Sequence, residues 1–119
     1  MSEEKILVVD DDEASRDLVA TVLRRDGYVI SLAFNGEDAL EKIPELQPSL
    51  VISDLNMPKI NGLELHSTLK EKFPSIAFIL MSGAEFSEDD LKIYDLTYFL
   101  KKPLRFEELR SVIAKVMTE

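Results

Sequence analysis

Residues 50–65 read LVISDLNMPKINGLEL. This stretch begins with a short apolar run, Leu50–Ile52, which follows Pro48 and has the length and β-branched content of a fully buried strand. The run delivers Asp54 to the carboxyl end of the strand, where open α/β sheets place ligands and chemistry. Asp54 is therefore a candidate site residue, although an aspartate that only caps the following turn has the same pattern.

Four further runs predict strands, and the segments between them predict helices. The strands are Ile6–Val9, Tyr28–Phe34, Ile76–Met81 and Thr97–Leu100. Helical spacing marks five helices, with Leu18, Val19, Val22 and Leu23, with Ala39, Leu40 and Ile43, with Leu65, Leu69 and Phe73, with Leu91 and Tyr94, and with the stripe from Phe106 to Met117. This alternation predicts an α/β fold of three layers, αβα, in which helices cover both faces of a five-stranded parallel sheet.

Punctuating residues indicate where the helices begin and end. We expect Gly27 to end the first helix, Pro44 to end or kink the second, and Pro74 to end the third. Ser87 and Asp90 form an S-x-x-D start signal for a brief fourth helix.

The composition is that of an ordinary globular protein, and it excludes several kinds of site. Hydrophobic residues make up 45% of the chain and charged residues 31%, unlike a disordered segment. With no cysteine, disulfides, zinc-thiolate sites and thiol catalysis are excluded. His66 is the single histidine, which argues against a histidine-rich metal centre or a Ser-His-Asp hydrolase, and we expect it to pack or to be solvated.

The charge and the amino terminus indicate where this chain works. Lys and Arg number 14 against 23 Asp and Glu, and the net charge of −9 repels phosphate backbones, so we expect no direct nucleic-acid binding by this domain. The first residues are acidic where a secretory signal is basic, and no apolar run approaches the roughly 18 residues of a membrane span. We therefore expect a cytoplasmic protein without membrane contact.

Polar residues follow several of the apolar strands and are candidates for chemistry. These residues are Asp10, Asp11, Asp54, Ser82 and Lys102, and a parallel sheet brings them to one edge. Helix capping explains part of the acidic run that begins at Asp10. Two carboxylates about 4 Å apart repel by roughly 4 kcal/mol at an effective dielectric constant near 20, so converging acids predict a bound cation.

The motifs VVDDDE with Arg16 after it, SDLNMPKINGLEL, ILMSG and KKP together resemble the receiver domain of bacterial two-component response regulators. The resemblance runs from Lys5 to the last helix. It implies that residues 1–119 form one receiver domain with the flavodoxin-like, doubly wound fold and the strand order 2-1-3-4-5. It also implies a phosphorelay switch rather than an enzyme, with self-catalysed phosphorylation and slow autodephosphorylation.

The resemblance assigns a role to each acidic candidate. Asp54 is then the phosphoacceptor, which takes a phosphoryl group from the phosphohistidine of a partner kinase. Asp11 and Asp54 ligate Mg²⁺ together with the backbone carbonyl of Asn56, while Asp10 holds a coordinated water. Oxygen ligands, retained waters and one or two carboxylates are what Mg²⁺ prefers.

The remaining roles concern the phosphoryl group and the switch. Lys102 supplies positive charge, the Ser82 hydroxyl binds a phosphoryl oxygen, and Phe99 is the switch aromatic that turns inward when Ser82 moves. A cis peptide between Lys102 and Pro103 is expected from the family. The implied partners are a sensor histidine kinase or phosphotransfer protein and an unidentified output domain or target protein, with a possible phosphorylation-dependent dimer.

The chain departs from the family pattern between Ser82 and Lys102, where the spacing is slightly shorter than usual and Leu96–Thr97 replaces a common pair of small residues. We therefore expect the fourth helix to be short or irregular.

Three alternatives are weaker. An aspartate-nucleophile phosphatase typically shows Asp-x-Asp, whereas this chain reads Asp54-Leu55-Asn56 and lacks the second acid. A degenerate receiver that only docks partners would not need the full set of candidate residues. A flavin carrier of the same fold would need a phosphate-cradling loop after the first strand.

Overall fold

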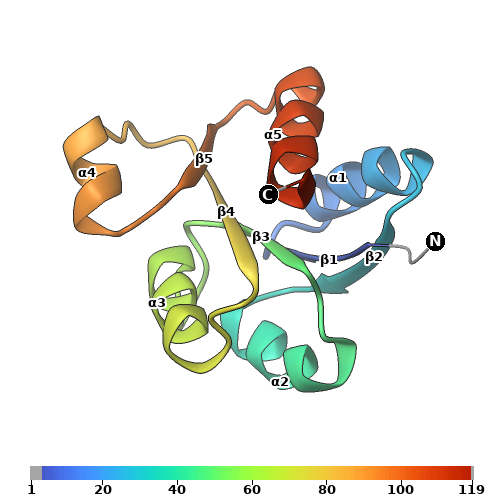
Figure 1. The fold of residues 1–119 in the computed structure, drawn as a ribbon, viewed down its shortest axis with the longest axis horizontal. Coiled ribbons are helices and arrows are strands. Elements are labelled where there is room, and N and C mark those ends of the chain that lie inside the picture. Colours follow the sequence, from blue (N-terminus) through green and yellow to red (C-terminus); the bar gives the residue numbers. More distant parts are fainter. Residues whose placement is uncertain (1–3, 119) are drawn as a thin grey trace.

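Strands and helices alternate along residues 4–118, the part of the chain that the computed structural model describes (Figure 1). The strands are β1 (Lys5–Val9), β2 (Val29–Ala33), β3 (Leu50–Asp54), β4 (Ala77–Ser82) and β5 (Tyr98–Lys101). The helices are α1 (Glu13–Arg25), α2 (Gly36–Leu46), α3 (Gly62–Lys72), α4 (Glu88–Ile93) and α5 (Phe106–Thr118). The predicted α/β fold of five strands and five helices is confirmed.

All five strands pair in parallel in the order β2-β1-β3-β4-β5, the expected order. The register between the two central strands determines where the acids lie. Val9 of β1 pairs with Ser53 of β3, so the residues that follow them, Asp10 and Asp54, leave the sheet next to each other. On the other side of β3, Asp54 pairs with Met81 of β4.

Helices cover both faces of the sheet, with α1 and α5 on one face and α2 and α3 on the other (Figure 1). Each face has its own apolar core. In β3, Leu50 and Ile52 pack toward α1 and α5, whereas Val51 packs toward α2 and α3. All three are fully buried, which explains why β3 is apolar at every position before its polar end.

Side-chain caps begin four of the helices. Asp12 accepts a hydrogen bond from the Ser15 amide, 3.0 Å away, at the start of α1, so one acid of the run after β1 serves the helix. Asn35 caps α2, and Asn61 begins α3 with a capping box. Ser87 and Asp90 form a capping box at the start of α4, where the S-x-x-D signal predicted the helix to begin.

Pro44 was expected to end or to kink α2. It does not end the helix, which continues to Leu46, and the kink stays a prediction. A proline inside a helix removes one backbone hydrogen bond and crowds the carbonyl four residues earlier, so the helix continues through Pro44 at a cost that its buried residues, Ala39 and Ile43, help to offset. The Gln47 amide closes the helix by donating to the carbonyl of Ile43 at 2.8 Å. The other expected ends agree: Gly27 lies just past α1 at a φ of 95°, and α3 ends before Pro74.

Helix α4 is short, as expected, and none of its six residues is buried. It lies at the edge of the fold (Figure 1), where its Leu91 packs, partly buried, against the core beside α3. Its neighbour His66, on α3, is one of the few polar side chains in the described core, where its ring stacks on that of Phe78 with centroids 4.7 Å apart. Of the two expectations for His66, packing or solvation, the structure shows packing. No helix of residues 4–118 is long and apolar enough to cross a membrane.

Gly62 allows the backbone of α3 to approach β3 closely. A Cβ at this position would lie 2.5 Å from the Asp54 carbonyl oxygen and 2.7 Å from Leu80 Cδ1. At Gly83, by contrast, a Cβ would meet nothing within 4 Å. We expect Gly62→Ala to lower the free energy of unfolding by about 1–3 kcal/mol, although alanine favours helices more than glycine does.

Urea unfolding of both variants checks this expectation. Gly83→Ala is the matched control, and it should leave stability unchanged or raise it by about 0.4–1 kcal/mol because it restricts the unfolded chain without a clash. Equal stabilities for Gly62→Ala and the unchanged protein would contradict the close approach.

Candidate functional site

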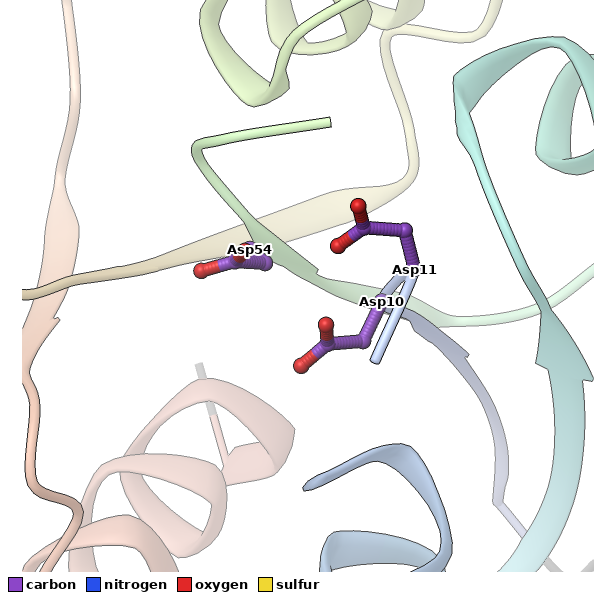
Figure 2. A group of neighbouring side chains, drawn as sticks. All are labelled: Asp10, Asp11 and Asp54. Carbon is purple, nitrogen blue, oxygen red and sulfur yellow. The ribbon is translucent and has the colours of Figure 1, made fainter. Parts of the chain in front are cut away.

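Three carboxylates converge at the carboxyl edge of the sheet (Figure 2). Asp10 and Asp11 follow the last residue of β1, and Asp54 is the last residue of β3. One carboxylate oxygen from each lies within 4.8 Å of the others. Asp10 and Asp54 are buried, with 1% and 8% of their surface exposed, whereas Asp11 is exposed. The cluster therefore joins two desolvated acids to one that solvent can reach.

Lys102 brings a cation to the same place from the end of β5. Its Nζ lies 2.9 Å from Oδ1 of Asp54 and 3.6 Å from Oδ2 of Asp10. Its backbone amide donates to the Ser82 carbonyl at 2.8 Å, which extends the pairing of β4 and β5 by one residue. The peptide bond between Lys102 and Pro103 is cis, as expected.

The pKa values of Asp10 and Lys102 show how strongly the cluster couples. Burial raises the pKa of Asp10 above its usual range, and the Asp12 amide, which donates to Asp10 Oδ1 at 2.9 Å, and the Lys102 ammonium only partly oppose this shift. Burial alone would lower the pKa of Lys102. Its hydrogen bond to Asp54 and the charge of Asp10 outweigh burial and raise that pKa instead.

The donor set fits a hard divalent cation. Oδ2 of Asp10 is buried and accepts no hydrogen bond among residues 4–118, although the Lys102 ammonium lies 3.6 Å from it. Three carboxyl groups surround a single ammonium, so Lys102 alone does not match the number of acids in the cluster. All the ligand atoms are oxygens, which suits Mg²⁺.

The other sequence candidates lie near this edge but outside the carboxylate cluster. Ser82, the last residue of β4, is buried, and its hydroxyl accepts a hydrogen bond from the Ala84 amide at 3.0 Å. Phe99 is half-buried on β5, with its ring centroid 4.8 Å from that of Phe86. Asn56 is exposed in the loop after β3. The functions expected of Ser82, Phe99 and Asn56 stay predictions.

Arg16 supports the cluster through a contact that the sequence analysis does not predict. Its Nη1 donates to the backbone carbonyl of Asp10 at 3.1 Å, which ties α1 to the end of β1. The signal in the sequence was the position of Arg16 one helical turn after Asp12, the helix cap.

An apolar hollow opens beside the cluster, between α1 and the segment that follows β5. Its volume is about 270 Å³, and it is lined by Leu18, Leu104 and Phe106 together with Asp10 and Lys102. Leu18 was grouped with the core-facing positions of α1, but the structure exposes 54% of its surface. It lies at the edge of the helix's apolar stripe, where helical spacing alone does not separate core from rim.

Comparisons with known proteins agree with this geometry. Residues 6–114 match the family model described as the response regulator receiver domain. The chain is 31% identical over 120 residues to sporulation initiation phosphotransferase F of Bacillus subtilis, covering 98% of this chain and 96% of that protein. It is 34% identical over 121 residues to the uncharacterized transcriptional regulatory protein YesN of Bacillus subtilis, covering 97% of this chain and 33% of that protein.

A solved structure shows the same likeness in three dimensions. The chemotaxis protein CheY4 of Vibrio cholerae matches with a TM-score of 0.88 and 27% sequence identity, covering 97% of this chain and 99% of the CheY4 chain.

Removal of the Lys102 ammonium should destabilise the protein in a pH-dependent way. Lys102→Met leaves Asp10 and Asp54 buried without their cation, and we expect a loss of about 1–3 kcal/mol in the free energy of unfolding at pH 7. Because Lys102 lowers the pKa of Asp10, its removal raises that pKa further, and the folded protein then takes up a proton more readily. The loss should therefore shrink as the pH falls from 7 toward 3.8, the ordinary aspartate pKa.

Denaturant unfolding at a series of pH values, without added divalent cation, measures this effect. Lys101→Met is the matched control, since Lys101 is exposed and pairs with Glu85 outside the cluster. A loss that is the same at every pH would show that Lys102 acts through packing of its aliphatic stem and not through its charge.

Proposed function

We propose, from the premise that this chain belongs to the response regulator receiver domain family, that Asp54 accepts a phosphoryl group from the phosphohistidine of a sensor histidine kinase or phosphotransfer protein. Receiver domains are signalling switches of two-component systems. The observation that carries the proposal is the Asp54 carboxylate itself, which lies at the carboxyl edge of the sheet among two further carboxylates and 2.9 Å from an ammonium.

The chemistry is a displacement at phosphorus. An oxygen of the Asp54 carboxylate forms a bond to phosphorus, the bond from phosphorus to the donor's imidazole nitrogen breaks, and the imidazole leaves with the electron pair. Lys102 orients the carboxylate through Oδ1 before the reaction. During transfer, its ammonium neutralises charge on the phosphoryl oxygens. Positioning and electrostatic stabilisation of this kind supply most of the catalysis in phosphoryl transfer.

The carboxylate cluster would hold Mg²⁺. Asp11 and Asp54 would be direct ligands with the Asn56 carbonyl, and Asp10 would hold a coordinated water. When bound, Mg²⁺ supplies the positive charge that lets an anionic nucleophile approach an anionic phosphoryl group. The buried Oδ2 of Asp10 supports this role, because among residues 4–118 it accepts no hydrogen bond and is paired only through charge with the Lys102 ammonium, 3.6 Å away.

Ser82 and Phe99 would convert phosphorylation into a change of surface. The Ser82 hydroxyl would exchange its hydrogen bond from the Ala84 amide for contact with a phosphoryl oxygen. Its displacement would open space for Phe99, which is only half-buried and lies on the neighbouring strand. Phe99 has no hydroxyl, so the altered surface would depend on packing rather than on a hydrogen bond from this ring.

The hollow lined by Leu18 and Phe106 would be the docking site of the phosphodonor, because it lies next to Asp10 and Lys102. A phosphodonor seated there would bring its histidine to the edge of the sheet where Asp54 lies.

The activity of the whole protein is a wider proposal. The chain spans 33% of YesN and 26% of the transcriptional regulatory protein ZraR of Salmonella typhimurium, but 96% of the Bacillus phosphotransferase. Both arrangements suit a cytoplasmic receiver, acting either on an attached output domain or on a separate target protein. Dimerisation on phosphorylation is one form that the output would take.

Intact mass after incubation with acetyl phosphate and Mg²⁺ tests the proposal. The protein should gain one phosphoryl group, and the gain should be absent in Asp54→Asn and in the presence of EDTA. Ser53→Ala is a matched control, because Ser53 adjoins Asp54 but turns its hydroxyl to the Asp54 backbone carbonyl.

Two outcomes would contradict the proposal. A phosphoryl group retained in Asp54→Asn would place the acceptor elsewhere. Rapid turnover of external phosphoesters, with release of inorganic phosphate, would instead identify an aspartate-nucleophile phosphatase.

A further inference from the structure

The turn between α4 and β5 is held against α3 by polar contacts that the phosphorylation chemistry does not use. Asp95 occupies this turn in the left-handed conformation, with a φ of 54°. Its backbone carbonyl oxygen lies 3.0 Å from Nε2 of His66, and its carboxylate pairs with the ammonium of Lys70. His66 and Lys70 are one helical turn apart on α3, so the same face of this helix contacts both the carbonyl and the carboxylate of Asp95.

These contacts matter because α4 is otherwise held by few contacts, chiefly those of its partly buried Leu91, which packs against the core beside α3. None of its six residues is buried, and its end is closed by the amides of Asp95 and Leu96, which donate to the carbonyls of Lys92 and Leu91 at 3.1 and 2.8 Å. A non-glycine residue with a positive φ needs support from its surroundings, and the contacts from α3 supply it. The first buried residue after α4 is Leu96, which anchors the start of β5.

Only one of the two ring nitrogens of His66 has a hydrogen-bond partner among residues 4–118. Its ring stacks on Phe78 of β4 and is 8% exposed, and its Nε2 donates to the Asp95 carbonyl. In this tautomer Nδ1 is an acceptor, and it is buried without a hydrogen-bond partner among residues 4–118. Protonation would turn Nδ1 into a buried donor that has no acceptor, which is costly.

We propose that the Asp95 turn is a latch, closed on α3 by His66 and Lys70, which holds α4 and the start of β5 in place and loosens when Phe99 rearranges. The latch itself rests on geometry alone, whereas its coupling to Phe99 rests on the proposed function. The latch lies close in sequence to the site residues: β5 begins three residues after Asp95 and carries Phe99, and Lys102 follows the end of β5. Phe86, which precedes α4, links the two sides, with its ring 4.8 Å from that of Phe99 and 6.3 Å from that of Tyr94.

The latch is also expected to respond to acid. Burial, and after it the ammonium of Lys70, hold the pKa of His66 below its ordinary value of 6.5. The charged or titratable groups around the ring are Lys70 from α3, Asp95 from the turn and Tyr98 from β5, whereas its neighbour from β4 is the uncharged Phe78. A hollow of about 190 Å³ lined by these residues lets an expelled, protonated ring reach solvent.

Hydrogen exchange at the amides of Asp95 and Leu96, measured by NMR on the unphosphorylated protein, tests the latch. His66→Phe keeps an aromatic ring against Phe78 but removes the donor to Asp95, and we expect exchange of both amides to rise severalfold, up to about tenfold. Amides of β1 and β3 should not change. His66→Gln, whose amide can still donate, should keep more protection than His66→Phe.

Controls separate the latch from general loosening. Ser67→Ala changes the adjacent, exposed residue of α3 and should leave the turn as it is. Lys70→Met should raise exchange at the turn as well, through the lost ion pair. Unchanged exchange in both His66→Phe and Lys70→Met would overturn the latch, as would an equal rise throughout the sheet.

The pH arm uses the same amides. In the unchanged protein, exchange relative to its intrinsic rate should rise as the pH falls from 7.5 to 5.5, because the unlatched state takes up a proton on His66 and the latched state resists it. This rise should be absent in His66→Phe. The same rise in His66→Phe would show that another group is responsible.

Acetyl phosphate with Mg²⁺ then tests the coupling. Phosphorylation should increase exchange at Leu96 and Phe99 in the unchanged protein but not in Asp54→Asn. A phosphoryl group gained without a change at these amides would overturn the coupling and leave the proposed function standing. If no phosphoryl group is gained, the proposed function fails, and the variants of His66 and Lys70 still decide whether the latch exists.

Discussion

Three carboxylates and one ammonium meet at the edge of a parallel sheet, and the charge of this group is the constraint on which the rest of the site depends. At separations near 4 Å, each pair of carboxylates repels by roughly 4 kcal/mol at an effective dielectric constant near 20. Lys102 offsets part of this repulsion from 2.9 Å away, and burial of Asp10 makes the remainder more costly. The arrangement of this cluster therefore suits a second, divalent cation.

The fold supplies the rigidity that this cluster requires. Asp10 and Asp54 lie at the ends of neighbouring strands in which Ile6–Val9 and Leu50–Ser53 are buried, so neither acid can move away without disrupting a core. Gly62 lets α3 sit directly against the backbone of Asp54, and Arg16 ties α1 to the carbonyl of Asp10. By contrast, α4 buries none of its residues, and the side of the sheet near β5 is free to respond. The stiff and the adaptable parts therefore lie on opposite sides of the acceptor.

The sequence predicted the parts of this arrangement that depend on local pattern. Continuous apolar runs predicted the strands. The acids and Lys102 come directly after such runs, and the sequence predicted that they lie together because strand ends in a parallel sheet share an edge. Contacts between distant segments carry no such signal. The grip of His66 on Asp95 and the exposure of Leu18 depend on how helices pack. The passage of α2 through Pro44 likewise depends on how the rest of the helix packs, because a proline there costs a hydrogen bond and a steric clash.

Calorimetric titration with Mg²⁺ in the absence of any phosphodonor tests most directly the claim that the carboxylate cluster is a cation site in competition with Lys102. The account predicts saturable binding of one ion, loss of that binding in Asp11→Asn, and tighter binding in Lys102→Met, in which the ammonium no longer offsets the carboxylates. Heat that is the same in Asp11→Asn as in the unchanged protein, or an absence of saturable binding, would contradict it.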